Sequence, residues 1–338
     1  MKIAVDSMGG DYNIPYFNIE GSLLAIKESE SLEIKLIGPI EKLKEALSKY
    51  AKKYKKLIDK IELVNSNEVV SMDEQPSKAL RNKQDSSIAV GIKLLKDNLV
   101  DGFVSAGNSG AILAFALAYI GTFENISRPA IATIFPTYVS PCIILDVGAN
   151  VDCKPKHLVE FAYMGKVYCE NLLNKKFPKV ALLSIGTEET KGNTQILETF
   201  ELLKKDKNLN FIGNIEGKDI PFGVADVIVT DGFVGNIILK FGEGIAEMLL
   251  SLIKQSLKKH PFVLLSLPFV WNAIRDLRKK VDFSEYGGAP LLGLKKICII
   301  SHGRSNAKAI KNAIKLAKDM AEKRINEAIY NSIKEILI

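Results

Sequence analysis

Short apolar runs alternate with helical patterns along almost the whole chain, and this alternation limits the possible folds more than any other feature. Several runs lack the polar residue at every second position, as is typical of strands covered on both faces. Strands that alternate with helices predict an α/β protein, an open three-layer, mostly parallel sheet with helices on both faces. We expect strands at Lys2–Asp6, Glu33–Ile37, Lys60–Val64, Gly102–Ser105, Ala130–Phe135, Cys142–Asp146, Val180–Ile185, Val227–Thr230 and Ile297–Ser301.

Two longer stretches carry a helical pattern. Glu41–Leu57 places its leucines and tyrosines on one stripe, and Ala307–Ile338 predicts a long amphipathic helix at the end of the chain. No internal repeat, low-complexity segment or linker separates the elements. We therefore expect residues 1–338 to form a single α/β domain, and the pattern leaves open whether this domain has two lobes.

The composition limits the partners and the cellular location of the protein but not its fold. The 338 residues include 46 Lys and Arg against 39 Asp and Glu, a net charge of +7 that fits an anionic partner or surface. The four cysteines lack metal-binding spacing, so we expect reduced thiols and no metal. The first residues, MKIAVDSMGGD, contain no signal-peptide core, and no run is long enough to span a membrane. We expect a cytoplasmic protein with no nucleic-acid partner.

Glycine and polar residues gather just after the expected strands, where open α/β sheets bind their ligands. A single such loop can be explained by backbone geometry alone, but several together predict a binding site. Seven loops share this composition: DSMGGD (6–11), SAGNSGA (105–111), DVGAN (146–150), IGTEETKGN (185–193), GNIEG (213–217), DGFVGN (231–236) and SHGRS (301–305).

The chemistry that these loops favour is anion binding. Gly107, Asn108, Ser109 and Gly110 precede the apolar helix expected over Ala111–Ile120. Free N–H groups at that helix start, with the Ser109 hydroxyl, would hold a phosphate or an oxyanion. The alternative is that Asn108 or Ser109 merely caps the helix.

Other loop residues offer charge and proton transfer. Lys191 would neutralise a phosphate, or be an ordinary surface lysine. Asp231 and Asn236 flank a second strand-to-helix turn, where Asp231 would orient Lys191, act as a base, or cap the helix. His302 is either structural or catalytic. The candidates for binding phosphate or a thioester also include Gly186, Asn214 and Arg304.

Several familiar catalytic patterns are missing from the sequence. There is no G-x-x-x-x-G-K-[ST] loop, no H-E-x-x-H pair and no G-x-S-x-G turn. No serine or cysteine nucleophile with a paired base is visible either. We therefore expect no cofactor, and a reaction in which one bound substrate attacks another directly.

Residues 249–282 have an unusual composition for a surface segment. They contain seven basic and two acidic residues around an uncharged centre with the single tryptophan, and two prolines favour a helical hairpin. An apolar tip with basic flanks fits an interfacial membrane anchor, although dimerisation would also bury it. The expected membrane contacts are Phe262, Val263, Leu264, Leu265, Leu267, Phe269, Val270 and Trp271.

Taken together, the motifs resemble those of bacterial phosphate acyltransferases, the enzymes that start phospholipid synthesis from acyl-carrier protein. The resemblance covers essentially the whole chain in order, and two small departures are Ser7 in place of alanine and Ser109 in place of threonine. The matching segments are the seven loops with their flanks, EVVSMDEQPSKALRNKQDSS (68–87), RPAIATIFP (128–136) and EYGGAPLLG (285–293).

The resemblance implies a fold similar to phosphotransacetylases and β-decarboxylating dehydrogenases. It implies transfer of a long-chain acyl group from acyl-carrier protein to inorganic phosphate, in a homodimer bound peripherally to the inner face of the cell membrane. The product would pass to a membrane glycerol-3-phosphate acyltransferase. Arg81 and Lys83 are expected to contact the carrier or phosphate. Phosphotransacetylase activity on coenzyme A thioesters, a dehydrogenase and a catalytically silent membrane scaffold remain alternatives.

Overall fold

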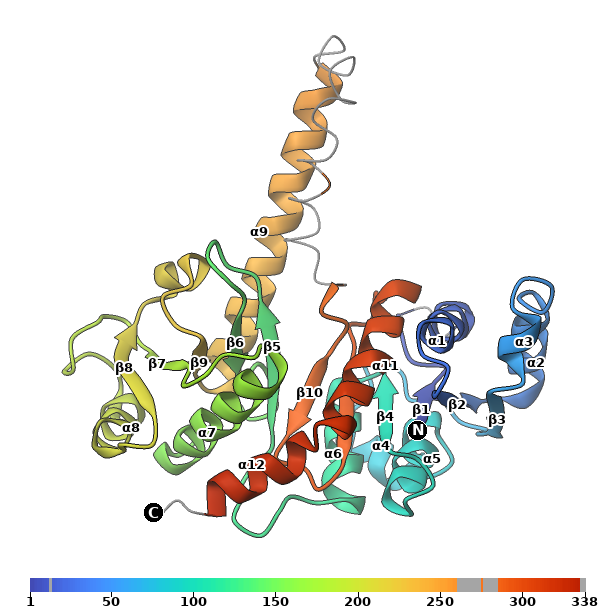
Figure 1. Ribbon diagram of the computed structural model, residues 1–338, viewed down its shortest axis with the longest axis horizontal. Helices are drawn as coiled ribbons and strands as arrows, with labels where there is room; N and C mark the ends of the chain where they lie inside the picture. The colour runs from blue at the N-terminus through green and yellow to red at the C-terminus, as the bar shows by residue number, and fades with distance from the viewer. Residues whose placement is uncertain (12–13, 260–274, 276–284, 335–338) are drawn as a thin grey trace.

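The computed structural model describes residues 1–11, 14–259, 275 and 285–334. The strands that it describes form one 11-stranded sheet in the order β3-β2-β1-β4-β11-β10-β5-β6-β9-β7-β8 (Figure 1). The strands are β1 (Lys2–Asp6), β2 (Glu33–Gly38), β3 (Ile61–Asn65), β4 (Gly102–Ser105), β5 (Ala130–Phe135), β6 (Cys142–Leu145), β7 (Lys179–Leu183), β8 (Asn210–Ile215), β9 (Val227–Val229), β10 (Ala289–Leu292) and β11 (Ile297–Ile300).

The sheet consists of two parallel groups that run in opposite directions. In one group β3, β2, β1, β4 and β11 are parallel, and in the other β6, β9, β7 and β8 are parallel. Three antiparallel pairings join them, between β11 and β10, β10 and β5, and β5 and β6. The expected mostly parallel α/β sheet is confirmed, with an antiparallel centre that the strand pattern did not predict.

Helices cover both faces of this sheet (Figure 1). Side chains alternate between the faces along β1, where Ile3 and Val5 join one apolar cluster and Ala4 joins the other. The first cluster includes residues of α1, α7 and α11, and the second includes residues of α5 and α6. The helices are α1 (Tyr16–Glu28), α2 (Ile40–Ser48), α3 (Lys55–Ile58), α4 (Pro76–Asn82), α5 (Ser87–Lys96), α6 (Ser109–Tyr119), α7 (Pro155–Leu172), α8 (Thr194–Lys205), α9 (Gly232–Lys259), α11 (Ala307–Glu322), α12 (Ile325–Lys334) and the 3-10 helix η1 (Gly217–Phe222).

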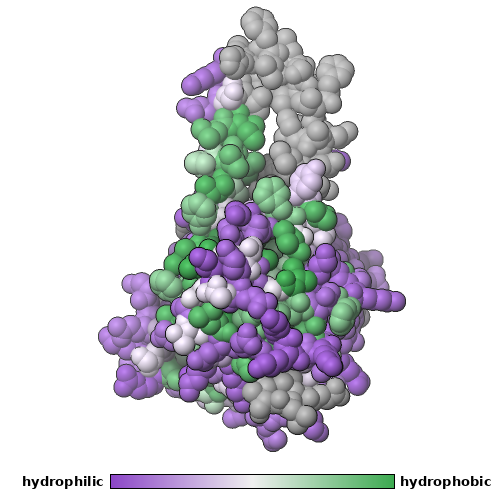
Figure 2. Space-filling model, turned by 90° about the vertical axis from the view of Figure 1, so that its left-hand side faces the viewer, coloured by the Kyte–Doolittle hydropathy of each residue, from purple (hydrophilic) through white to green (hydrophobic). Residues whose placement is uncertain are grey.

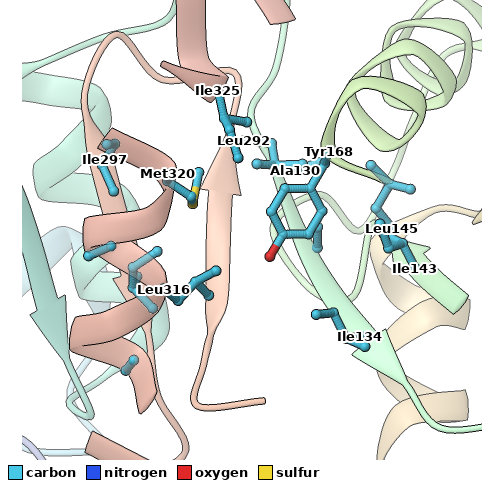
Figure 3. Packing of buried hydrophobic residues seen from close by; sticks show 14 of the residues in the cluster. Ala130, Ile134, Ile143, Leu145, Tyr168, Leu292, Ile297, Leu316, Met320 and Ile325 are labelled. Atoms are coloured by element: carbon cyan, nitrogen blue, oxygen red, sulfur yellow. The ribbon is translucent and has the colours of Figure 1, made fainter. Parts of the chain in front are cut away.

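One apolar cluster continues across the middle of the sheet and joins the two parallel groups. Figure 3 shows Met320 and Leu316 of α11 near Leu292 of β10, with Tyr168 of α7 on the other side beside Ala130 of β5. These side chains are almost completely buried. The two groups therefore share a core.

Both long helices expected from the sequence are interrupted, so those predictions were wrong in length. After α2 the chain makes tight turns, with Tyr50 N–H donating to the Leu47 carbonyl and Lys53 N–H to the Tyr50 carbonyl, before α3 begins. The apolar stripe survives because Tyr54 remains buried. The C-terminal stretch breaks at Arg324, whose φ of 49° is left-handed. This break lets α12 turn and pack on α7.

Two strands were not predicted. β10 is a four-residue strand containing a proline, too short to show a pattern. β8 includes Gly213–Ile215, although the glycine there predicts a loop. Gly213 has a φ of 96° and faces the register shift between β7 and β8, so the glycine marks an irregular strand rather than its end.

Helix α9 rises from the body of the molecule (Figure 1). It is a single helix from Gly232 to Lys259, so the first arm of the segment expected as a hairpin of short helices continues a helix that starts well before residue 249. The predicted membrane contacts at residues 262–271 lie outside the described residues. None of the helices in the described part of the chain is both long and apolar enough to cross a membrane.

Candidate functional site

Loops from the first parallel group meet at the carboxyl ends of β1, β4 and β11. We call residues 6–11, 71–76, 105–110 and 301–305 the first loop cluster. The Asp11 N–H donates to the Gly303 carbonyl at 2.9 Å, and Ser301 N–H donates to the Ser105 carbonyl at 2.8 Å. Gly9 lies so close to this assembly that a methyl group there would be 2.7 Å from the Gly107 nitrogen. The glycine therefore allows the two backbones to touch.

The buried Asp6 carboxylate organises this cluster. It accepts hydrogen bonds from Met8 N–H and Gly9 N–H at 3.0 Å each and from the Ser105 hydroxyl at 2.7 Å. Burial raises the pKa of Asp6, and these hydrogen bonds oppose the rise. Ser105 Oγ also accepts from Gly107 N–H at 3.0 Å. The N–H groups of Met8 and Gly9 are thus committed to the protein itself.

Asn108 connects two parts of the cluster. Its Oδ1 accepts from Ala111 N–H at 2.9 Å and caps α6, while its Nδ2 donates to the carbonyls of Ser71, Met72 and Glu74 at 3.2, 3.0 and 2.9 Å. The Asn108 side chain therefore has a structural role. Within the described residues, the backbone N–H groups of residues 108–110 have no recorded acceptor, and Ser109 is exposed. These three N–H groups are the candidate anion donors.

His302 and Arg304 lie at the exposed rim of the same cluster. The His302 Nδ1 accepts from Arg304 N–H at 3.1 Å, so the neutral ring carries its proton on Nε2. The Arg304 guanidinium lies 4.0 Å from Asp11 Oδ2 and 3.7 Å from Oε1 of Glu247 on α9. Arg304 thereby connects the loops to the rising helix.

Arg81 and Lys83 lie beside the first loop cluster, because α4 packs on α6. The Lys83 ammonium is 2.8 Å from the Glu74 carboxylate and donates to the Val69 carbonyl at 2.6 Å. This pairing lowers the pKa of Glu74. Arg81 is exposed, and its recorded hydrogen bond runs from Nε to the Ser77 carbonyl at 3.2 Å. Of the two, Arg81 is the more available to a partner.

Loops of the second parallel group form another cluster. We call residues 146–153, 184–193 and 231–236, with Asn214 of β8, the second loop cluster. Asp146 is its buried organiser. Its Oδ1 accepts from the N–H groups of Ile131, Gly148 and Ala149, and its Oδ2 accepts from the Asn150 backbone and side chain. Burial raises the pKa of Asp146, as it does for Asp6.

Asp231 and Asn236 lie at the start of α9 within this cluster. The Asp231 carboxylate accepts from Val234 N–H at 2.8 Å, which is the helix-capping alternative considered from the sequence. Asn236 is inside the helix rather than in the turn. Its side chain faces Gly148, where an added methyl group would lie 3.7 Å from Asn236 Cγ. The Asn236 amide is therefore held next to the loop that Asp146 organises.

The structure brings Lys191, Gly186 and Asn214 together. The Lys191 stem packs on Gly186, whose added methyl group would lie 2.8 Å from Lys191 Cγ. Lys191 is exposed, and its ammonium has no recorded partner among the described residues. Asn214 Nδ2 donates to the Glu188 carbonyl at 3.0 Å, and its buried Oδ1 has no partner there. No contact is recorded between Lys191 and Asp231 in the described part of the chain.

The predicted site residues therefore divide between two clusters. Because the strands of the two parallel groups run in opposite directions, their carboxyl ends point toward opposite sides of the molecule. Helix α9 connects the clusters, with Asn236 at the second and Glu247 at the first. Eleven helical residues span about 16 Å. Asp6 and Asp146 were not among the expected site residues, although both share a signal: an aspartate at a strand end with glycine following within three residues.

Within the described residues, no three His, Cys, Asp or Glu side chains are grouped so that they could hold a metal ion. The two loop clusters contain backbone N–H groups, side-chain amides, cationic side chains and two buried carboxylates.

Comparison with known proteins gives one consistent result. A family model described as "Fatty acid synthesis protein" matches residues 1–328. A protein named phosphate acyltransferase from Endomicrobium trichonymphae is 50% identical over 333 residues, which cover 98% of each chain. A protein of the same name from Thermodesulfovibrio yellowstonii is 49% identical over 335 residues, covering 99% of this chain and 95% of that protein.

Solved structures share the fold at low sequence identity. A phosphotransacetylase from Streptococcus pyogenes superposes with a TM-score of 0.60 at 20% identity and covers 95% of this chain and 94% of its own. A branched-chain phosphotransacylase from Enterococcus faecalis gives a TM-score of 0.57 at 14% identity, with coverages of 94% and 99%. These likenesses support the fold.

Proposed function

The chain belongs to the phosphate acyltransferase family, and we propose that it transfers a long-chain acyl group from acyl-carrier protein to inorganic phosphate, giving acyl phosphate for phospholipid synthesis. Transfer of an acyl group to phosphate follows from the family. The long chain, the carrier protein and the mechanism are our proposal.

The observation that carries the proposal is the start of α6. Residues 108–110 present three N–H groups at a helix N-terminus, beside the exposed Ser109 hydroxyl. A helix start of this kind attracts an anion through its unsatisfied donors and the helix dipole. The Asn108 cap and the Asp6 network hold the loop rigidly, so the donors are oriented before any ligand arrives.

The reaction that fits these groups is direct attack. A phosphate oxygen adds to the thioester carbonyl carbon, the carbonyl oxygen becomes an oxyanion, and the carbon–sulfur bond then breaks as the thiolate of the carrier leaves and takes up a proton. An N–H donor aimed at such an oxyanion is typically worth about 3 kcal/mol of barrier. The protein supplies position and charge, with no acylated side chain.

In the second loop cluster, Lys191 would neutralise negative charge and the Asn236 amide would donate to an oxygen of the substrate. Lys191 is suited to this because its exposed ammonium has no recorded partner in the described residues. Asp231 caps α9 through one oxygen, Oδ1, and its other oxygen would accept a proton from dihydrogen phosphate. His302 and Arg304 would act at the first cluster.

We further propose a homodimer that binds the inner face of the cell membrane and passes its product to a membrane glycerol-3-phosphate acyltransferase. Support comes from α9, where apolar side chains gather on the part of the helix that rises from the body (Figure 2). Exposed apolar residues recur every three to four positions along α9: Phe233, Ile237, Phe241, Ile245, Met248, Leu249, Leu252 and Ile253. Such a stripe would be covered by a second copy or by lipid.

The test of the reaction is phosphate-dependent loss of palmitoyl-carrier protein with formation of acyl phosphate. Acetyl coenzyme A serves as the competing substrate, because a phosphotransacetylase would consume it with phosphate. Turnover of palmitoyl-carrier protein that needs phosphate supports the proposal. Turnover of acetyl coenzyme A alone, or trapping of an acylated side chain during the reaction, would contradict it.

The membrane proposal is tested with Val263→Asp combined with Leu264→Asp. We expect the double variant to lose sedimentation with anionic liposomes while it keeps palmitoyl-carrier turnover. Liposome binding equal to that of the unchanged protein would contradict the anchor, and analytical ultracentrifugation of both proteins reports the dimer separately.

A further inference from the structure

Arg128 lies in the turn before β5 and is exposed, yet both of its neighbours are fixed by buried side chains. Ser127 donates from its N–H and its hydroxyl to the two oxygens of Glu160, at 2.9 and 2.8 Å. On the other side, the Pro129 carbonyl accepts from Asn150 Nδ2 at 2.7 Å. The backbone around Arg128 is therefore fastened at both ends.

Holding Ser127 in this way requires a buried carboxylate, which costs free energy. The Glu160 side chain has an exposure of 0%, and the Lys156 ammonium is 3.9 Å away. Burial raises the pKa of Glu160, while the hydrogen bonds from Ser127 oppose the rise. Burying a carboxylate is unfavourable unless hydrogen bonds compensate it. The compensation here fixes the position of an exposed arginine.

The position of Arg128 places it at the second loop cluster. Because β5 is antiparallel to β6, the start of β5 lies beside the end of β6, and Ile131 N–H donates to Asp146 Oδ1 at 3.0 Å. Asn150, which holds Pro129, also donates to Asp146 at 2.9 Å. One network of buried polar groups thus fixes both Arg128 and the loop that Asn236 faces.

Basic side chains gather near Arg128, and one of them, Lys156, lies 3.9 Å from the Glu160 carboxylate. Within the described residues the Arg128 guanidinium has no recorded ion pair, and Lys154, Lys156 and His157 at the start of α7 are its basic neighbours. Burial and repulsion by Arg128 and the two lysines lower the pKa of His157. Cations held close together repel each other until an anion joins them, and a planar guanidinium binds the oxygens of a phosphate in pairs.

We propose that Arg128 is a binding residue for a phosphate group of a substrate at the second loop cluster. The inference rests on the proposed function, which supplies two phosphate groups of the same chemistry: inorganic phosphate and the phosphodiester of the carrier's phosphopantetheine arm. Arg128 forms a bidentate pair with one of them, and the Lys154 side chain adds positive charge beside it.

The experiment compares Arg128→Ala and Arg128→Lys with the unchanged protein, and Arg324→Ala is the matched control because Arg324 is an exposed arginine of the α11–α12 connection. Michaelis constants are measured separately for inorganic phosphate and for palmitoyl-carrier protein. We expect Arg128→Ala to raise one of the two constants about ten- to hundredfold, as for loss of a charged hydrogen-bonded pair. Arg128→Lys should recover part of the loss, because it keeps the charge but not the fork.

The Michaelis constant that rises identifies the source of the phosphate group. A rise for inorganic phosphate assigns Arg128 to the nucleophile, and a rise for the carrier assigns it to the phosphopantetheine arm. Calorimetric titration of each protein with inorganic phosphate and with phosphopantetheine measures binding without turnover, so it decides the proposal even if the proposed reaction fails. Arg128→Ala with Michaelis constants and binding equal to those of Arg324→Ala would overturn it.

Discussion

Replacing Gly235 by alanine tests the packing of α9 on the second loop cluster. An added methyl group at Gly235 would lie 1.9 Å from the Asp146 carbonyl oxygen, which is backbone and has no side-chain freedom to yield. To reach ordinary contact, the helix start has to recede by about 1.5 Å. Gly244 is the matched control, because it lies in the same helix and an added methyl group there meets nothing within 4 Å.

The magnitudes follow from these distances. Overpacking of this kind costs about 1–3 kcal/mol, while alanine in place of glycine inside a helix gains about 1 kcal/mol. For a chain of this length, 1 kcal/mol corresponds to about 1.5 °C in melting temperature. We expect Gly244→Ala to melt about 1.5 °C higher than the unchanged protein and Gly235→Ala to melt up to about 3 °C lower.

The two variants should also differ in activity. Gly235→Ala moves the neighbouring Asn236 away from Gly148, so we expect at least a tenfold loss of kcat/KM for acyl phosphate formation, whereas Gly244→Ala keeps it. Differential scanning fluorimetry and a steady-state assay on both variants are sufficient. Equal melting temperatures and equal turnover for the two variants would refute this account of how α9 is seated.

Three further predictions concern single side chains. Asn108→Ala should lower the free energy of unfolding by about 3 kcal/mol, because it removes a helix cap and three hydrogen bonds. Asn108→Ser should recover about 1 kcal/mol of this loss by restoring the cap. Urea unfolding measures both variants, and an unaltered stability of Asn108→Ala would show that the amide is free for substrate. Lys191→Ala should abolish most turnover with little change in melting temperature, while Lys205→Ala, an exposed lysine of α8, should change neither; full activity of Lys191→Ala would remove that lysine from the mechanism. The folded pKa of His157 is below its ordinary value of 6.5, so as the pH falls through this range the unfolded chain takes up the proton first and stability is lost. Protonation also turns the His157 Nδ1, which accepts from Lys154 N–H, into a donor. Between pH 7.5 and 5.5, the melting temperature of His157→Gln should therefore fall less than that of the unchanged protein. Parallel plots of melting temperature against pH for the two proteins would contradict this role.

Much of the architecture could be predicted because it follows from local pattern. The unbroken apolar runs at Ile3–Val5 and Ile143–Leu145 are buried on both faces in the structure, as their lack of alternation predicts. The capping signal at Asn108 was also readable, because the amide and the following apolar helix are neighbours in sequence. The family was readable because ten motifs occur in order along the chain.

The rest depends on contacts between distant residues. Six of the seven loops follow strands that the sequence predicts, but the direction of each strand in the sheet comes from pairing. Three antiparallel pairings separate the loops into two clusters. The roles of Asp6 and Asp146 likewise depend on backbone donors that converge on a buried carboxylate.

The α/β class, the family and the residue types available for anion chemistry all follow from local periodicity and motif order along the chain. Which of those residues are free for a ligand depends on the folded arrangement. Lys83 and the Asn108 amide are used within the protein, whereas Arg128 is held exposed by groups 22 and 32 positions away, Asn150 and Glu160. Hydrogen-bond partners are set by distance in space, and no spacing along the chain encodes them.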